Sequence, residues 1–143
     1  MTDIVDRATR SRLMSAITGA NTLPERLVRS ALHREGLRFR LHVATLPGRP
    51  DVVLPKWRAV IMINGCFWHQ HRGCRYATVP AQNRSFWRTK FRGNLERDER
   101  NVAALRALGW RVIVVWECQV RRGRVLDTLA ARIRNVRQSE DVR

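Results

Sequence analysis

The chain lacks any long apolar segment, and this absence excludes one class of protein. No stretch of its 143 residues approaches the roughly 18 to 20 consecutive apolar residues that span a bilayer. Its first residues, Met1–Asp6, also lack the basic and then apolar layout of a signal peptide. We therefore expect a soluble, intracellular protein that does not contact a membrane.

The chain also has few cysteines and no composition that would mark a boundary between domains. No internal repeat, low-complexity tract or Gly/Pro/Ser-rich linker divides it, so we expect a single domain over residues 1–143. Within that domain we expect an N-terminal helix in residues 1–20 and a C-terminal helix and tail over about residues 123–143. Three cysteines are an odd number, and in an intracellular protein they favour thiols or metal ligands over disulfides.

Acidic residues are scarce, and this shortage sets the net charge. Twelve Asp and Glu residues stand against 28 Lys and Arg residues, which gives a formal net charge of +16. Such an excess in a small domain favours a polyanionic partner, nucleic acid first. Nearly all the basic residues are arginines, whose planar guanidinium suits bidentate contacts with phosphate and guanine. A basic surface that serves only solubility is the alternative.

The hydrophobic pattern predicts the order helix–strand–strand–strand–helix–strand–helix. A short basic helix is expected over about residues 6–17, and a second helix starts near Thr22, with an early proline and Glu25 completing a capping box, and ends at Gly36. The alternation of apolar and polar side chains over residues 37–43 predicts a strand with one buried face. The remaining elements are strands over 51–54, 59–63 and 112–116, an irregular stretch to about 83, a helix to 108 and a closing helix over about 125–137. This order indicates an α/β fold, a short mixed sheet flanked by helices.

Three cysteines and a histidine have the spacing of a zinc site. Cys66, His71 and Cys74 lie within nine residues, and Cys118 follows the last predicted strand. Together they can surround one tetrahedral ion as a Cys₃His set, and thiolates favour zinc over magnesium or calcium. Such a site is closed and structural. His69 is the rival for the histidine position, and unrelated buried thiols with surface histidines are the alternative to a metal site.

An acidic residue and a histidine suggest phosphodiester chemistry. Asp51 opens an apolar strand directly after a tight turn, where a carboxylate can project towards a cleft. Enzymes that cut phosphodiesters use such a carboxylate to hold a hard cation, usually magnesium, against phosphate oxygens. His69 is the nearest candidate for the base that activates water. Glu25 needs no catalytic role if it only completes a capping box with Thr22.

Paired aromatic residues occur twice near basic side chains. Phe67 and Trp68 are adjacent, so they cannot both face inward in a regular strand. In a basic protein, exposed aromatics suggest stacking on bases or wedging between base pairs. Core packing is the alternative for at least one member of each pair. The second pair, Phe86 and Trp87, is surrounded by Arg84, Arg88 and Lys90.

Four segments together resemble the very-short-patch repair (Vsr) endonucleases. They are Leu46–Asp51, Gly65–His69, Asn94–Asp98 and Gly109–Cys118, and the opening Asp6–Ser11 with Met14 also fits. The match covers roughly residues 3 to 122, in order and with family-like spacing. It implies a fold akin to type II restriction endonucleases and a magnesium-dependent DNA endonuclease that nicks one strand 5′ to the thymine of a T·G mispair, the product of 5-methylcytosine deamination. It further implies a bacterial, cytoplasmic and nucleoid-associated enzyme that acts on double-stranded DNA as a monomer.

The same resemblance implies a role for each candidate residue. Magnesium is held by Asp51 and by the main-chain carbonyl of Ile63. His69 activates the attacking water, with Glu25 and Asp98 as supporting acidic groups. One structural zinc is held by Cys66, His71, Cys74 and Cys118. The DNA is contacted by the major-groove wedge of Phe67, Trp68 and Trp87, by Met14 from the minor-groove side, and by Lys90 near the mispaired bases.

The chain departs from the family pattern at Asn64, where the family typically carries histidine. Asparagine donates a hydrogen bond but carries neither a proton nor a positive charge, and losing a charged stabiliser at a phosphoryl centre costs a few kcal/mol. We therefore predict slower cleavage than in a histidine-bearing relative. Two other functions remain open. One is a non-catalytic zinc-containing protein that binds distorted DNA, and the other is a restriction-type nuclease that cuts both strands of a defined site.

Overall fold

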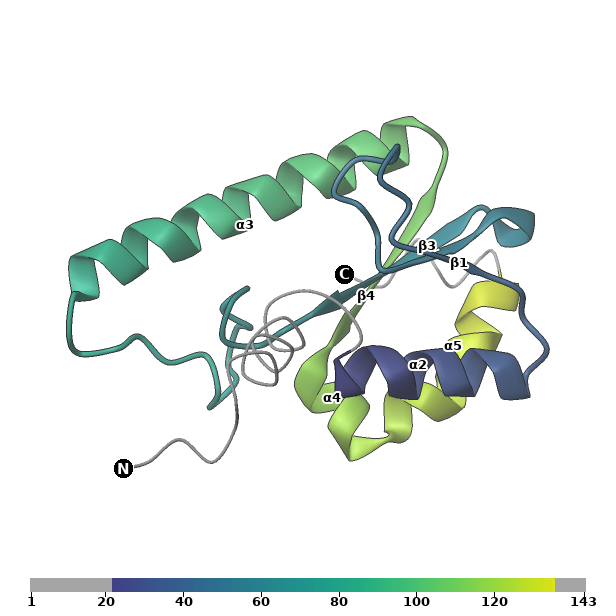
Figure 1. The fold of residues 1–143 in the computed structure, drawn as a ribbon, viewed down its shortest axis with the longest axis horizontal. Coiled ribbons are helices and arrows are strands. Elements are labelled where there is room, and N and C mark those ends of the chain that lie inside the picture. The colour runs from purple at the N-terminus through teal and green to yellow at the C-terminus, as the bar shows by residue number, and fades with distance from the viewer. Residues whose placement is uncertain (1–21, 136–143) are drawn as a thin grey trace, which may run out of the picture.

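A four-stranded mixed sheet forms the centre of the molecule (Figure 1). The computed structural model describes residues 22–135, so the predicted helix over 6–17, Met14 and the end of the tail lie outside the described residues. The strands lie in the order β1-β2-β3-β4, with β1, β2 and β3 antiparallel and β3 parallel to β4. Their bounds are Arg40–Leu41, Val52–Leu54, Ala59–Asn64 and Arg111–Trp116.

Helices cover both faces of this sheet, which confirms the predicted α/β class (Figure 1). Helix α3 connects the parallel strands β3 and β4 across one face. A single 3₁₀ turn, Pro55–Trp57, joins β2 to β3. In residues 22–135, no helix combines the length and the apolar character needed to cross a membrane. The helices are α2 (Leu23–Arg34), α4 (Glu117–Arg122) and α5 (Arg124–Arg134) on one face, and α3 (Arg84–Ala107) on the other.

Strand β3 is an unbroken apolar run because both of its faces are buried. Side chains alternate along a strand, so Ala59 and Ile61 belong to the core beneath α2 and α5, whereas Val60 packs with Leu105 of α3. The two buried layers explain why the segments around 59–63 and 112–116 lack a polar face in the sequence. The first layer includes Val28, Leu32, Ile113, Val115, Leu129 and Ile133.

The predicted boundaries of α2 are confirmed. Thr22 is the N-cap, and its Oγ1 accepts a hydrogen bond from the Glu25 backbone N–H at 3.4 Å. The helix is capped at its other end by Glu35, and Gly36 follows with a φ of +71°, a left-handed conformation that glycine adopts without steric cost. The start of α2 is therefore fixed in position at one end of the sheet.

The strand predicted over residues 37–43 was wrong in extent. Only Arg40–Leu41 pair with β2, and Leu41 is 39% exposed. The extended chain ends at His42, whose φ is +47°. The buried face is therefore limited to Leu37 and the partly buried Phe39.

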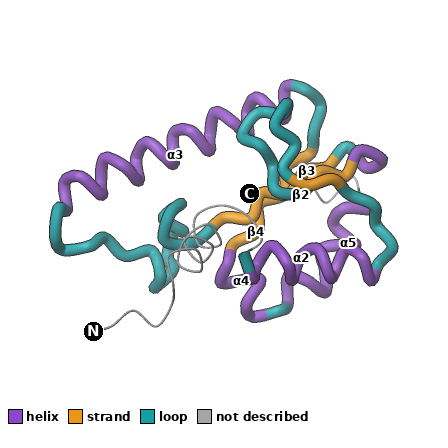
Figure 2. Tube along the Cα trace, in the orientation of Figure 1, coloured by secondary structure: helices purple, strands orange, loops and turns teal. Residues whose placement is uncertain are grey.

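Helix α4 was not predicted, and the closing helix is shorter at its far end than predicted. Gly123, at φ +86°, separates α4 from α5. Six residues are too few to show a helical hydrophobic period, so the sequence carried no strong indication of α4. Helix α5 ends at Arg134, with Asn135 as its C-cap, rather than at residue 137. The stretch between β3 and α3 is irregular to Asn83 as predicted (Figure 2).

Candidate active site and cysteine–histidine cluster

The candidate residues come together because three strand ends meet at one edge of the sheet. In the parallel pair β3–β4, Asn64 is the partner of Trp116, so both strands end at the same edge. In the antiparallel pair β2–β3, Val52 is the partner of Ile61, which sets Asp51 beside the last residues of β3. Carboxyl ends of parallel strands are a common place for ligand sites.

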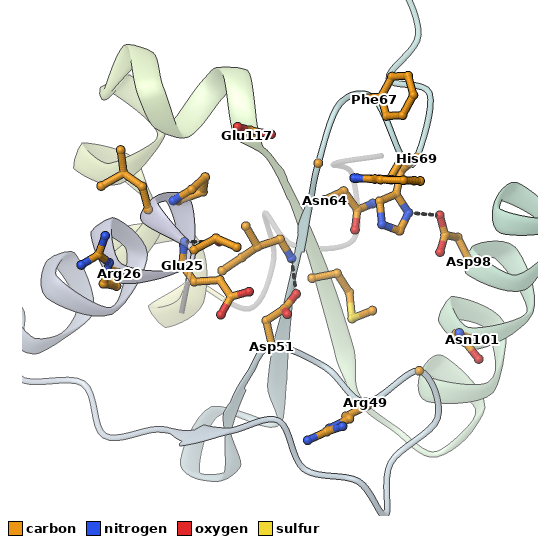
Figure 3. A pocket seen from close by; sticks show the side chains of 18 of the residues that line it. Glu25, Arg26, Arg49, Asp51, Asn64, Phe67, His69, Asp98, Asn101 and Glu117 are labelled. Carbon is orange, nitrogen blue, oxygen red and sulfur yellow. Dashed lines mark hydrogen bonds and ion pairs between the residues drawn. The ribbon is translucent and has the colours of Figure 1, made fainter. Parts of the chain in front are cut away.

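An open cavity of about 800 Å³ lies at this edge (Figure 3). It is lined by the start of α2, the turn at 48–51, the end of β3, the loop at 65–69 and the middle of α3. Acidic side chains, Glu25 and Asp51, point towards one another inside it. Four exposed arginines stand around it, which makes the rim attractive to phosphate: Arg26, Arg49, Arg97 and Arg121.

Asp51 is a carboxylate held in a partly desolvated place. Its Oδ2 accepts a hydrogen bond from the Ile63 backbone N–H at 2.7 Å. Burial, with the added repulsion of Glu25, raises the pKa of Asp51 to about 6, although the Ile63 N–H, His42 and His69 act in the opposite direction. A cation bound at this carboxylate would offset both the desolvation and the repulsion.

The Glu25 carboxylate has surroundings that a helix cap does not explain. The residue is 5% exposed, and its Oε2 lies 3.0 Å from Arg29 and 3.4 Å from His42 Nε2. His42 Nδ1 in turn lies 3.9 Å from Asp51 Oδ1. The possible ligand atoms of Glu25, His42 and Asp51 all lie within 4.8 Å of one another, close enough to surround one cation. The sequence did not indicate His42 as a site residue, because it occupies a polar position of a predicted strand.

His69 and Asp98 form a close pair across the cavity wall. His69 Nδ1 lies 2.6 Å from Asp98 Oδ2 (Figure 3). A second bond nearby, from Asn94 Nδ2 to the Trp68 carbonyl oxygen at 3.0 Å, also joins this loop to α3. With Nδ1 engaged by the carboxylate, Nε2 is the ring nitrogen that can accept a proton. Only the resemblance linked Asp98 with His69, because the two are far apart in the sequence.

Asn64 lies in the wall of the same cavity. It is the last residue of β3, is 9% exposed, and lies between Asp51 and His69 in Figure 3. Within residues 22–135 its side chain makes no hydrogen bond. Its amide is therefore available to a group that enters the cavity.

The four residues of the predicted zinc set also meet, behind this cavity. Their ligand atoms lie within 4.8 Å of one another, and His71 Nδ1 is 3.4 Å from Cys118 Sγ and 3.8 Å from Cys66 Sγ. Ligands at about 2.0 to 2.3 Å from a tetrahedral ion are separated by about 3.4 to 3.8 Å. His69, the rival ligand, is bonded to Asp98 instead. The cluster consists of Cys66, His71, Cys74 and Cys118.

The β3–β4 register delivers the distant cysteine to this cluster. Cys66 and Cys118 each lie two residues beyond the paired Asn64 and Trp116, so the parallel register brings them together. Trp116 stacks on the His71 ring with 4.1 Å between centroids. Burial raises the pKa of the Cys66 thiol to about 12, and the neighbouring Cys118 side chain adds to the rise. A cation at this place would favour the ionised thiols.

The aromatic residues expected to be exposed are mostly packed against one another. Phe67 contacts Trp68, Trp87 and Phe91 with ring centroids 5.0, 5.8 and 5.2 Å apart. The first three of these are half-buried and Phe91 is buried, whereas Phe86 is 60% exposed. Packing, the alternative given for at least one member of each pair, therefore accounts for part of the surface of Phe67, Trp68 and Trp87, whereas Phe86 is the exposed member of the second pair. Lys90 is exposed on α3.

The cavity has the character of a nuclease site, because a half-buried carboxylate and a histidine that can take a proton face a space rimmed by arginines. The sequence profile of the family "DNA mismatch endonuclease Vsr" matches residues 2–75. The chain belongs to this family, and it is a DNA endonuclease.

Three relatives match most of the chain. It is 47% identical to the "Type II nicking enzyme V.XorIIP" of Xanthomonas oryzae pv. oryzae over 136 aligned residues. The alignment covers 95% of this chain and 97% of the relative. It is 48% identical over 121 residues to the "DNA mismatch endonuclease Vsr" of Escherichia coli, covering 85% and 77%. Identity to the "Type II nicking enzyme V.NmeAIP" of Neisseria meningitidis is 42% over 121 residues, covering 85% and 86%.

Proposed function

We propose that this endonuclease nicks one strand of double-stranded DNA 5′ to the thymine of a T·G mispair. The observation that carries the proposal is the His69–Asp98 pair, 2.6 Å apart, in one cavity with the half-buried Asp51. The names of the relatives, a mismatch endonuclease and several nicking enzymes, support single-strand cleavage. We also propose a fold of the type II restriction endonuclease kind and a monomer that acts in the cytoplasm, at the nucleoid.

Asp51 and the main-chain carbonyl of Ile63 would hold Mg²⁺. The donor set fits a hard cation, because both ligands are oxygens. The Ile63 N–H donates to Asp51, and the N–H and C=O of one strand residue point to the same side, so the Ile63 carbonyl faces the Asp51 side as well. When bound, Mg²⁺ would supply positive charge against the phosphate oxygens.

His69 would act as the general base. Its Nε2 takes a proton from a water molecule while Asp98 holds Nδ1 and stabilises the charged ring. The water oxygen then bonds to phosphorus, and the P–O bond to the departing sugar oxygen breaks. Glu25 would accept hydrogen bonds from water molecules around the cation that Asp51 would hold. Asn64 would donate a hydrogen bond to the phosphate, less effectively than a charged histidine, so we expect a slowed enzyme.

Mismatch preference would come from the aromatic cluster. Phe67, Trp68 and Trp87 would wedge into the duplex from the major groove, with Lys90 near the mispaired bases. Met14, outside the described residues, would enter from the minor-groove side. Unstacking costs least at a deformable or mispaired step, so a wedge favours such steps.

A structural zinc held by Cys66, His71, Cys74 and Cys118 would fix the loop that carries this wedge. Residues 65–83 contain no helix or strand, so the loop needs another source of order. The S···N separations of 3.4 and 3.8 Å agree with tetrahedral coordination, and a closed Cys₃His set is typical of structural zinc.

The test is cleavage of end-labelled duplexes that differ only in one T·G versus C·G pair, with and without magnesium. We expect a nick in one strand of the T·G duplex alone, which Asp51→Ala abolishes. Cleavage of both strands of a matched site would instead indicate a restriction-type enzyme. Tight binding of the T·G duplex with no nick under any metal would indicate a protein that only recognises distorted DNA. Equal binding and equal nicking of the T·G and C·G duplexes would contradict mismatch specificity.

A further inference from the structure

His42 lies between the buried carboxylate of Glu25 and the half-buried carboxylate of Asp51, with a different ring nitrogen towards each. Its Nδ1 is 3.9 Å from Asp51 Oδ1, and its Nε2 is 3.4 Å from Glu25 Oε2. Nε2 is buried, and apart from this approach to Glu25 it has no polar partner among residues 22–135. No function described so far uses this imidazole.

The backbone holds His42 in this place. The residue has a left-handed φ of +47°, which is uncommon outside glycine, and its N–H donates to the Asp51 carbonyl oxygen at 3.4 Å. Unusual backbone conformations persist where the surrounding structure enforces them. The hydrogen bond between the main chains of His42 and Asp51 therefore keeps the two side chains next to each other.

The two carboxyl oxygens of Asp51 have separate surroundings. Oδ2 accepts the Ile63 N–H at 2.7 Å, whereas Oδ1 is the atom that faces His42 Nδ1. Neighbouring ligands of an octahedral ion, each about 2.1 Å from it, are about 3.0 Å apart. The 3.9 Å between Oδ1 and Nδ1 leaves room for an ion between them, and the two atoms would approach each other by about 1 Å when they bind it.

We propose that His42 is a direct ligand of the catalytic cation, through Nδ1, and that Glu25 orients the ring by accepting a hydrogen bond from Nε2–H. A histidine that binds a metal through one nitrogen commonly donates the other N–H to a carboxylate, which fixes its tautomer. The inference rests on the proposed function, because it concerns the same cation site. Glu25 thereby acts as a positioning residue for the imidazole.

An imidazole ligand changes which cations the site prefers. Mg²⁺ favours oxygen ligands and retains its waters, whereas first-row transition-metal ions bind imidazole nitrogen readily. The site should therefore bind Mn²⁺, and the ions that follow it in the affinity series, more tightly than oxygen ligands alone would allow. Loss of His42 should therefore weaken Mg²⁺ binding less than it weakens Mn²⁺ binding.

The experiment uses Mn²⁺ as the probe on the full-length chain with the cysteine cluster loaded with zinc. Pulsed electron paramagnetic resonance of bound Mn²⁺ should show nitrogen hyperfine coupling in the unaltered protein. His42→Gln should abolish the coupling and weaken Mn²⁺ binding roughly tenfold or more, while Mg²⁺ affinity, measured by competition, falls by a smaller factor. His42→Asn is the second variant, because asparagine tolerates a positive φ if glutamine impairs folding.

Two other histidines serve as controls. His33→Gln removes an exposed ring that contacts Phe39 in a tilted arrangement outside the cavity, so it should leave coupling and affinity unchanged. His69→Gln should keep the nitrogen coupling. Absence of coupling in the unaltered protein, its persistence in His42→Gln, or its loss in His69→Gln would overturn the inference.

Nicking of the T·G duplex with Mg²⁺, measured on the same preparations, separates this inference from the proposed function. A protein that nicks but shows no nitrogen coupling overturns only the role of His42. Coupling that depends on His42 in a protein that nicks with no metal supports the ligand and contradicts the proposed function instead.

Discussion

Replacing Asp51 with asparagine should make the metal-free protein more stable while abolishing cleavage. Asp51 is ionised at neutral pH in a place where burial and Glu25 both disfavour its charge. Asparagine removes that charge but keeps an oxygen that can accept the Ile63 N–H, now 2.7 Å from Oδ2. The carboxylate that we propose as the cation ligand is thus one that lowers the stability of the metal-free fold.

The magnitude follows from the pKa. Asp51 titrates at about 6 in the folded protein, against 3.8 for an unperturbed carboxyl. A difference of about two units corresponds to about 3 kcal/mol. The folded state holds the proton more tightly than the unfolded state, so stability falls as the pH rises from about 4 to about 6, and the full loss is present above that window. Asp51→Asn should therefore gain about 2 to 3 kcal/mol at neutral pH, or roughly 5 to 10 °C in melting temperature.

The assay is thermal unfolding over a pH series without added magnesium, in buffers with the same amount of added zinc throughout. The difference in stability between Asp51→Asn and the unaltered protein should have its full value of about 2 to 3 kcal/mol near pH 7.5 and fall to about half of that value near pH 5. Added Mg²⁺ should stabilise only the unaltered protein. Glu99→Gln is the matched control, since it removes the same charge at an exposed position of α3 and should change stability by less than about 0.5 kcal/mol.

A variant that melts at or below the temperature of the unaltered protein near pH 7.5 would refute this reasoning, as would a gap that does not change with pH. Either result would mean that the charge of Asp51 is compensated in the folded protein, and the cavity would then need no cation to offset it.

Three further outcomes are expected. His69→Gln should slow single-turnover nicking of a T·G duplex by about 10²- to 10⁴-fold, and Asp98→Asn should slow it less; unchanged rates would contradict the role of the pair. Cys118→Ala should lose bound zinc, measured by atomic emission, and melt at a lower temperature, because a structural zinc contributes folding energy; a variant that keeps its zinc would argue against the cluster. Asn64→His should speed nicking on the order of tenfold or more, and no gain would contradict the account of Asn64.

The sequence predicts best where burial leaves only one pattern possible. The segments 59–63 and 112–116 are apolar throughout because both faces of the central strands are covered, and both were identified. The capping residue Thr22 and the positive φ at Gly36 likewise fixed the ends of α2. The grouping of all three cysteines with His71 followed from their chemistry, although the register that delivers Cys118 is not written in any local pattern.

The sequence predicts poorly where tertiary contacts override a local pattern. Residues 37–43 alternate as a strand does, yet the backbone at His42 turns to a left-handed conformation beside Asp51. That turn places an imidazole among acidic groups, which no spacing in the chain indicates. The contacts among Phe67, Trp68 and Trp87 likewise depend on where α3 lies, so composition alone overstated their exposure.

The loop that carries the aromatic pair also carries the histidine. Phe67, Trp68 and His69 are consecutive, and two hydrogen bonds fasten this short segment to α3, one to Asp98 and one from Asn94. Because both bonds hold the same three-residue segment, Phe67 and Trp68 cannot shift without also moving His69. If Phe67 and Trp68 select the mispair and His69 activates the water, as proposed, then a substitution that weakens either hydrogen bond should change mismatch preference and cleavage rate together.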